Sequence, residues 1–211
     1  MKRTALYLAA GSFLLLVGAL CGAHSSPAQS SAQSFVRTPG QSFFLDLDTA
    51  YGNSSRWSHN DLQGITALRA NVKVLRLSEQ TVGWVSRFSF MLQGKQATDT
   101  QEALDDSAVE VRLMTKKPKL MLLSVLTWPS KADRLSPTGK SVEEKQLQKT
   151  LGENESVSME ISWAPAGTVT IKVDGAETYQ VKIPWTVKSV SASMTNGEVE
   201  VDPLEFGNLK K

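Results

Sequence analysis

The chain has 211 residues, and its first 28 have the composition of a removable segment. They contain the only cysteine and no acidic residue, and without Lys2 and Arg3 the 23 basic side chains fall to 21, equal to the 21 acidic ones. Balanced charge excludes nucleic-acid binders and polybasic membrane modules, which depend on excess cations. A chain without cysteine after residue 28 has no disulfide framework, thiolate metal site or cysteine nucleophile there.

The N-terminus has the three regions of a secretory signal peptide. Lys2 and Arg3 are followed by an apolar run over residues 5–20 and by small and polar residues over 21–29. Cleavage after Ala23 or after Ala28 leaves small residues at the two required positions. We therefore expect a signal peptide over residues 1–28 and an exported protein, periplasmic or extracellular.

Two other interpretations of this segment are a membrane anchor and a lipoprotein. A membrane anchor requires about 20 apolar residues, and the uninterrupted apolar core from Phe13 to Leu20 is too short. A lipoprotein acylated at Cys21 is the weaker alternative, because Leu20 stands where a small residue is usual. Residues 29–41 are rich in Ser and Gln and are expected to form a flexible lead-in, with one β-sandwich domain over residues 42–209.

The rest of the chain alternates apolar and polar residues with a period of two. This pattern predicts strands that are half buried, apolar toward a core and polar toward water. It occurs over residues 68–74, 82–92, 109–113, 157–163, 169–173 and 179–183. The segment Leu120–Trp128 is more uniformly apolar, so we expect a central strand covered on both faces.

Short turns separate several of these strands. Asp174-Gly175 is a strong hairpin signal because glycine adopts positive φ without a Cβ clash. Ala164–Gly167 and Asn196-Gly197 are predicted to form two further hairpin-like connections. Strands joined by short turns indicate an all-β fold, an antiparallel two-sheet β-sandwich of the jelly-roll kind.

Two stretches lack the alternation. Residues 98–106 are polar and acidic, which predicts a loop or a single helical turn. Residues 129–155 form a long connection, in which Ser141 to Glu144 resembles a capping box and Val142, Leu147 and Leu151 form a narrow apolar stripe. We expect at most one or two short surface helices, one of them here.

The C-terminal third resembles a known superfamily. Ser156–Trp163 followed by Gly167–Gly175 is similar to a strand pair of concanavalin A-like and laminin G-like jelly rolls. Glu198–Phe206 resembles their closing strand, and Trp84–Leu92 an early core strand. The resemblance implies a β-sandwich but specifies no activity.

The sequence contains no recognisable catalytic motif. Glucanases of this superfamily carry a Glu-x-Asp-x-x-Glu strand motif, which is absent, and Glu110 and Glu160 stand alone on their strands. Alginate lyases of this fold carry a Gln-x-His motif, and only a lone His59 follows the signal segment, in a turn-like run beside Trp57. A non-catalytic protein is therefore favoured, and an enzyme remains the alternative.

The superfamily resemblance also implies a structural Ca²⁺ between the terminal strands. Asp46 and Asp48 lie two apart and would share one face of a strand, and Asp202 lies in the expected closing strand. Carboxylate oxygens suit this cation. The alternative is that these are exposed strand and turn acids. No other cofactor is indicated.

The tryptophans are the candidate ligand-binding residues. Trp84 and Trp163 alternate in phase with apolar neighbours, which favours core packing. Trp57, Trp128 and Trp185 lie in or near expected loops and are the predicted exposed platforms. The leading hypothesis is a secreted or periplasmic jelly-roll module that binds carbohydrate or cell-envelope material.

Two alternatives to that hypothesis remain open. One is a structural protein that docks an envelope protein, and the other is a polysaccharide-active enzyme without a recognisable motif. The expected partners are a glycan or an envelope protein, with no nucleic acid and no transmembrane segment after removal of the signal.

Overall fold

The computed structural model describes residues 34–78, 85–94, 107–117, 119–130, 141, 143–165 and 167–210. Every regular element in these ranges is a β-strand, and every strand pair is antiparallel. The expected all-β antiparallel fold is confirmed. The strands are β1 (Ser34–His59), β2 (Ala67–Leu77), β3 (Arg87–Gln93), β4 (Ala108–Lys117), β5 (Leu120–Trp128), β6 (Glu143–Leu151), β7 (Ser156–Ala164), β8 (Thr168–Val173), β9 (Ala176–Lys182) and β10 (Ser189–Lys210).

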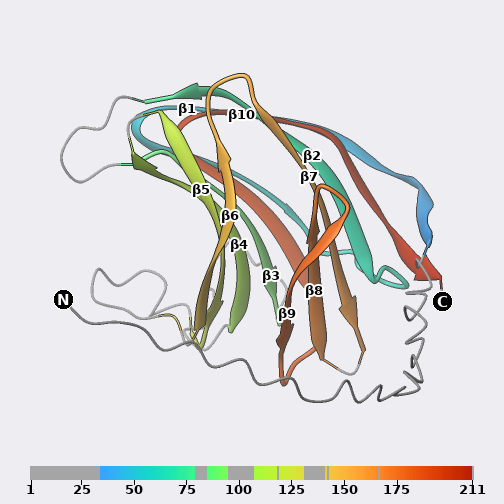
Figure 1. Cartoon of the computed structure of the whole chain (residues 1–211). Helices are drawn as coiled ribbons and strands as arrows, with labels where there is room; N and C mark the ends of the chain where they lie inside the picture. Colours follow the sequence, from blue (N-terminus) through green and yellow to red (C-terminus); the bar gives the residue numbers. More distant parts are fainter. Residues whose placement is uncertain are drawn as a thin grey trace, which may run out of the picture. The chain divides into compact units, whose positions relative to one another are not determined.

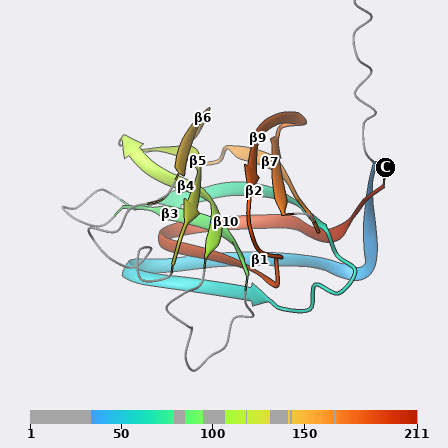
Figure 2. The ribbon, with the colours of Figure 1, turned by 90° about the horizontal axis from the view of Figure 1, so that it is seen from below.

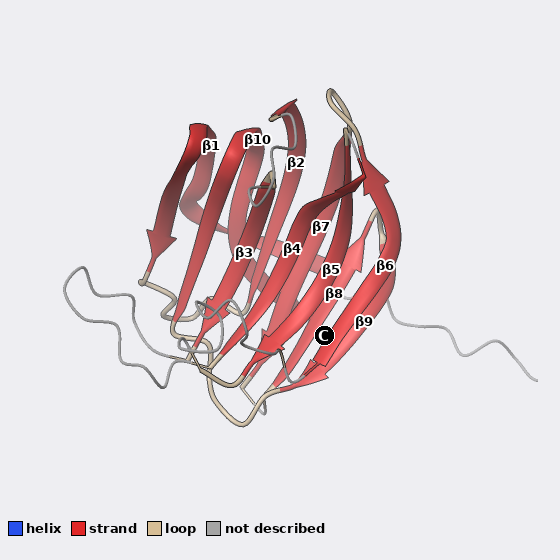
Figure 3. Cartoon of the chain, turned by 90° about the vertical axis from the view of Figure 1, so that its left-hand side faces the viewer, coloured by secondary structure: helices blue, strands red, loops and turns tan. Residues whose placement is uncertain are grey.

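The two longest strands, β1 and β10, join two layers into one hydrogen-bonded sheet (Figures 1 and 2). Residues 189–195 of β10 pair with β3, whereas residues 197–207 pair with β2. β1 pairs with β10 through both parts. We define sheet I as the layer of β6, β5, β4, β3 and the adjoining parts of β10 and β1. Sheet II is the layer of β9, β8, β7, β2 and the remaining parts of β10 and β1 (Figure 3).

The core lies between the two sheets, where the alternate apolar residues of both meet. Phe88 and Phe90 of sheet I are fully buried and pack edge to face at 5.0 Å, and Phe206 of sheet II is also fully buried. The alternation in β2, β4, β7 and β8 has the predicted inward face: Val109, Val111 and Leu113 lie in this core. Burial of such side chains contributes about 1.5–3 kcal/mol each.

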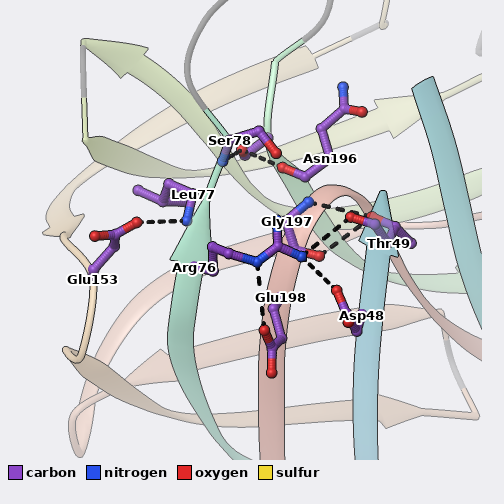
Figure 4. Close-up of polar contacts among 10 residues, drawn as sticks. Asp48, Thr49, Arg76, Leu77, Ser78, Glu153, Asn196, Gly197 and Glu198 are labelled. Atoms are coloured by element: carbon purple, nitrogen blue, oxygen red, sulfur yellow. Dashed lines mark hydrogen bonds and ion pairs between the residues drawn. The ribbon is translucent and has the colours of Figure 1, made fainter. Parts of the chain in front are cut away.

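A buried corner marks the point where β10 passes from sheet I to sheet II (Figure 4). Asn196 has a φ of 52° and no exposed surface. Its Oδ1 accepts a 2.6 Å hydrogen bond from the Gly52 amide, and its Nδ2 donates to the Val85 carbonyl at 3.4 Å. The Gly197 amide donates to Thr49 Oγ1 at 3.2 Å, so the bends of β1 and β10 are tied together.

This corner corrects the expectation of a turn at Asn196-Gly197. Both residues lie inside β10, and the register between Thr49 and Ser54 shifts opposite them. Asparagine and glycine tolerate positive φ in a bulge as well as in a turn. The same dipeptide therefore bends a continuous strand because β1 and β2 supply partners on both sides.

The helix expected after Ser141 is wrong, because residues 143–151 form β6. Leu147 and Leu151 are both buried, and their spacing of four places them on one face of either a helix or a strand. Pairing with β5 satisfies the backbone of this segment and decides between the two.

β1 is longer than expected at both ends. It begins at Ser34, so residues 34–41 of the expected lead-in belong to a strand. It also includes Trp57 and His59, which correct the predicted turn-like run to a strand that pairs with β10. The signal segment, Trp84, residues 98–106 and residues 131–140 lie outside the described residues, and no described helix is long and apolar enough to cross a membrane.

The predicted hairpin at Asp174-Gly175 is confirmed between β8 and β9. Asp174 has a φ of 50° and Gly175 a φ of 83°, the geometry that a two-residue turn between twisted strands requires. Asp174 Oδ2 lies 2.8 Å from Lys149 Nζ, and Oδ1 accepts a 3.1 Å bond from the Ser158 amide. The Lys149 hydrogen bond lowers the pKa of Asp174, partly opposed by burial, and the Ser158 bond lowers it further.

We expect Asp174→Asn to reduce the loss of stability at acid pH. A carboxyl with a lowered folded-state pKa stabilises the fold above its unfolded pKa of about 4 and loses this contribution as pH falls through the folded value. The side chain is half exposed, so the effect is about 0.5 kcal/mol. Urea midpoints at pH 6 and pH 2.5 test this, and equal pH dependence in both proteins would contradict it.

Candidate functional site

The outer face of sheet I, which points away from the core, concentrates polar and charged side chains. Strand alternation sends Phe88, Phe90 and Leu92 inward, so Arg87, Ser89 and Gln93 of β3 point outward. The pairing register places outward residues of six neighbouring strands in rows across this face. We call the set the arginine face: Arg56, Arg87, Ser89, Met91, Glu110, Arg112, Ser124, Leu126, Trp128, Glu144, Ser191 and Ser193.

Glu110 of β4 lies at the centre of the arginine face with no exposed surface. Its Oε1 pairs with Arg87 Nη2 of the neighbouring strand β3. Its Oε2 accepts a 2.7 Å hydrogen bond from Trp128 Nε1 of β5. A buried carboxylate requires such partners, and here the two adjacent strands supply both.

Arg112, two residues after Glu110 on the same face, is only 8% exposed and has surplus donors. One guanidinium nitrogen, Nη2, lies 3.4 Å from Glu144 Oε1 of β6, whereas Nε is buried without a partner. Burial lowers the pKa of Arg112, and the positive charge of Arg87 lowers it further. The negative charges of Glu110 and Glu144 act in the opposite direction and raise it. The site therefore holds a guanidinium that the protein does not fully satisfy.

A polar row connects Arg112 with Arg56 across four strands. The register aligns Arg112 with Ser89, Ser89 with Ser193, and Ser193 with Arg56. The two serine hydroxyls lie 3.1 Å apart, and Arg56 Nη2 donates to Gln93 Oε1 at 3.4 Å. Three interstrand spacings separate the backbones of the two arginines, roughly 14 Å measured perpendicular to the strands. Hydroxyl and guanidinium groups thus follow one line across the sheet.

A small apolar cluster borders the charged centre. Ala108, Leu126 and Trp128 are buried together, with Met91 packed against them, and they are separate from the main core. Arg87, Glu144 and Ser193 keep part of their surface exposed. The arginine face therefore combines buried central groups with accessible flanking groups, beside an apolar surface that carries an indole.

The predicted tryptophan platforms are not brought together. Trp128 is 7% exposed, so its expected exposure is wrong; Glu110 supplies the partner that allows its indole N–H to be buried. Trp57 is half buried and stacks on His59 at 5.9 Å, packed against the core. Trp185 is half buried over Gly94, where an added Cβ would come within 3.2 Å of the indole.

The predicted calcium ligands do not form a metal group. Asp46 and Asp48 share the exposed face of β1, as expected, but Asp48 pairs with Arg76 at 2.5 Å (Figure 4). Asp202 is exposed in β10. Within the ranges that the structure describes, no three His, Cys, Asp or Glu residues are placed to hold a metal ion.

A second surface feature lies on the outer face of sheet II. A pocket of about 360 Å³ is lined by Arg69, Ser158, Glu160, Lys172 and Gly175. Glu160 Oε2 accepts a 2.7 Å bond from Arg69, and Lys172 lies 3.8 Å from Oε1. Its charged groups already pair with one another, in contrast to Arg112.

The arginines of the candidate site were not predicted from the sequence. Arg87 and Arg112 occupy polar positions of alternating strands, where solvent-facing charges are ordinary. Arg56 lies in a run interpreted as a turn. The sequence signal for them is the pair Glu110 and Arg112, which alternates with the apolar Val109, Val111 and Leu113. This pair indicates a site only after β3, β4 and β5 have been aligned, because the partners of Glu110 lie on β3 and β5.

The fold is that of the concanavalin A-like jelly rolls. The carbohydrate recognition domain of Emp46p, in its potassium-bound form, has a TM-score of 0.52 at 10% identity, covering 81% of this chain and 90% of that one. A legume lectin-like domain from Entamoeba histolytica has a TM-score of 0.50 at 10% identity, covering 81% and 91%. A glycoside hydrolase family 16 endo-glucanase from Bacteroides ovatus scores 0.48 at 10% identity, covering 84% and 86%.

The two likenesses with TM-scores of 0.50 and 0.52 show the fold and leave the activity of this chain open. No family model matches the sequence, and no curated protein is similar to it. The resemblance predicted from the C-terminal strands is confirmed at the level of the fold: Ser156–Ala164 and Thr168–Val173 pair as β7 and β8, and β10 is the closing strand.

Proposed function

We propose that this chain is an exported, non-catalytic carbohydrate-binding module whose site is the arginine face. The observation that carries the proposal is the row of guanidinium and hydroxyl groups beside a buried indole cluster. The jelly-roll fold supports it, because a carbohydrate recognition domain and a legume lectin-like domain share this fold. The signal-like N-terminus supports export to the periplasm or the outside.

The chemistry of the arginine face suits a sugar. Sugar hydroxyls donate and accept hydrogen bonds. The face offers guanidinium donors, the partly exposed carboxylate of Glu144 as an acceptor, and the hydroxyl of Ser193, which does both. Met91, which is half buried beside the buried Leu126 and Trp128, can contact the C–H face of a pyranose ring. Ligand sites commonly combine a mainly apolar lining with a few placed polar groups.

A binding role is favoured over hydrolysis by the state of Glu110. Glycosidases use two carboxyl groups, one to protonate the leaving oxygen and one to act on the sugar or on water. Both oxygens of Glu110 are engaged by protein donors, Arg87 and Trp128, and Glu144 interacts with Arg112. These carboxylates hold the arginines in place and are not free to act on a substrate.

We expect Ser193→Trp to abolish polysaccharide binding. Ser193 lies in the middle of the polar row, and an indole there would cover the neighbouring hydroxyl and guanidinium groups. The matched control is Ser162→Trp, a half-buried serine on the outer face of sheet II. Affinity electrophoresis in gels that contain plant and envelope polysaccharides measures retardation for both variants and the parent.

The proposal requires that the parent and Ser162→Trp are retarded and that Ser193→Trp is not. Equal loss in both variants, or no retardation of the parent by any polysaccharide, would overturn it. Release of reducing ends from any retarding polysaccharide would overturn the non-catalytic part. Thermal midpoints of the three proteins verify that the substituted chains remain folded.

A further inference from the structure

The arginine face is richer in cationic donors than its own carboxylates can satisfy. Its five charged side chains are three arginines and two glutamates, and Glu110 is used by Arg87 and Trp128. Among the residues that the structure describes, Arg112 has one ion-pair contact, at 3.4 Å to Glu144, a carboxylate that is about one third exposed. The cation of the pair is the more deeply buried partner.

The unsatisfied atom lies in the buried part of this group. Arg112 Nε has no hydrogen-bond partner and no solvent access. The Arg112 side chain as a whole is nine-tenths buried. A buried donor without a partner is costly, and more so on a charged group. An unsatisfied buried donor requires an explanation, and a role of its guanidinium in a functional site is one.

We propose that the arginine face selects polysaccharides that bear anionic groups, with Arg112 and Arg56 as the two anion-binding positions. The inference rests on the proposed carbohydrate-binding function. A guanidinium presents a planar fork of donors that matches a carboxylate or a sulfate in two parallel hydrogen bonds. Uronic acid and sulfated sugars share this chemistry.

The spacing of the two positions supports a polymer over a single sugar. Arg56 and Arg112 stand at opposite ends of the polar row, three strands apart, with the hydroxyls of Ser89 and Ser193 between them. A chain lying across the strands would place anionic groups at the ends and a hydroxyl over Ser193, the more exposed of the two serines. Neutral sugars would leave the buried donor of Arg112 facing only weaker acceptors.

The experiment compares matched polymers at fixed ionic strength. Polygalacturonate, its carboxyl-reduced neutral product and a sulfated galactan are titrated into the purified protein by calorimetry. We expect at least tenfold tighter binding of one or both anionic polymers than of the neutral one, weakening as salt rises. The two anionic arms distinguish a carboxylate from a sulfate ligand.

Two variants locate the effect. Arg112→Gln and Arg56→Gln should each weaken anionic binding about tenfold and weaken neutral binding by a smaller factor; Arg56 is exposed, so its variant retains the fold. Arg112→Lys keeps the charge but loses the fork, and should recover only part of the affinity. Arg69→Gln, on the outer face of sheet II, is the control and should bind as the parent does.

The outcomes separate the two proposals. Equal affinity for reduced and anionic polymers, or an equal loss in the Arg69→Gln control, would overturn the anionic selectivity and leave carbohydrate binding intact. Binding of no polymer, neutral or anionic, would overturn the carbohydrate function and with it this inference. Selective anionic binding lost in both face variants would support both.

Discussion

Glu110→Gln is expected to destabilise the protein by about 3 kcal/mol, because removing one partner of a buried ion pair leaves the other charge uncompensated. The amide can still accept from Trp128, but it presents N–H groups to Arg87 and carries no charge to oppose Arg87 and Arg112. Urea unfolding at pH 7 measures the loss. Trp128 fluorescence should change in the same variant, since the indole loses its charged acceptor.

A double-mutant cycle with Arg87→Gln isolates the pair. The double variant should lose less than the sum of the singles, with a coupling of about 1–2 kcal/mol, because two neutral side chains leave no buried charge between them. Glu160→Gln is the matched control: a strand glutamate paired with an arginine, but with 14% of its side chain exposed, and expected to cost about 1 kcal/mol. A loss below about 0.5 kcal/mol in Glu110→Gln would contradict this account.

Asn196→Ala is expected to cost about 3 kcal/mol, the second large effect. The side chain is fully buried and hydrogen-bonds Gly52 and Val85, so its removal leaves the Gly52 amide of β1 and the Val85 carbonyl before β3 without these partners and leaves a cavity. Alanine also tolerates the φ of 52° less well than asparagine. Chemical unfolding measured by circular dichroism tests the loss.

Two further substitutions divide this effect into its causes. Asn196→Gly removes the hydrogen bonds without strain at positive φ and should cost less than alanine, whereas Asn196→Asp keeps the acceptor for Gly52 and loses the donor to Val85. Asn208→Ala, in the same strand and half buried, should cost under about 1 kcal/mol. An alanine variant at Asn196 as stable as Asn208→Ala would show that the corner does not depend on this side chain.

Sequence reasoning succeeded where structure is local. The alternation over residues 109–113 and 157–163 predicted strands with the correct inward face, because a strand between a core and a polar face must repeat every two residues. Asp174-Gly175 predicted its hairpin because positive φ is a property of those two residues alone.

It failed where two local solutions are equivalent. The spacing of Leu147 and Leu151 fits a helix stripe and a strand face equally well, and only the free edge of β5 decides for a strand. Asn196-Gly197 allows positive φ in a turn or in a bulge, and only the partners of β10 in both sheets decide for a bulge. The tertiary structure supplies hydrogen-bond partners that the segment itself does not specify.

The candidate site was beyond sequence reasoning for a related reason. Positions at strand ends predict exposed tryptophans, yet Trp128 is buried. Its indole N–H donates to the carboxylate of Glu110, which lies 18 positions earlier in the chain. Arg56 and Arg112 are 56 positions apart and meet in one row through three strand pairings. Adjacency across a sheet depends on register, which a single strand does not contain.

The sequence by itself determined the fold class, most strand positions and the hairpin at Asp174, since each follows from side-chain alternation or from the backbone preference of one or two residues. Only the tertiary structure decided that β10 bends between two sheets, that residues 143–151 are a strand, and that Arg87 and Arg112 lie beside the buried Glu110. Those features depend on pairing between distant segments, and the burial of Glu110 and Arg112 without full compensation exists only once that pairing has formed.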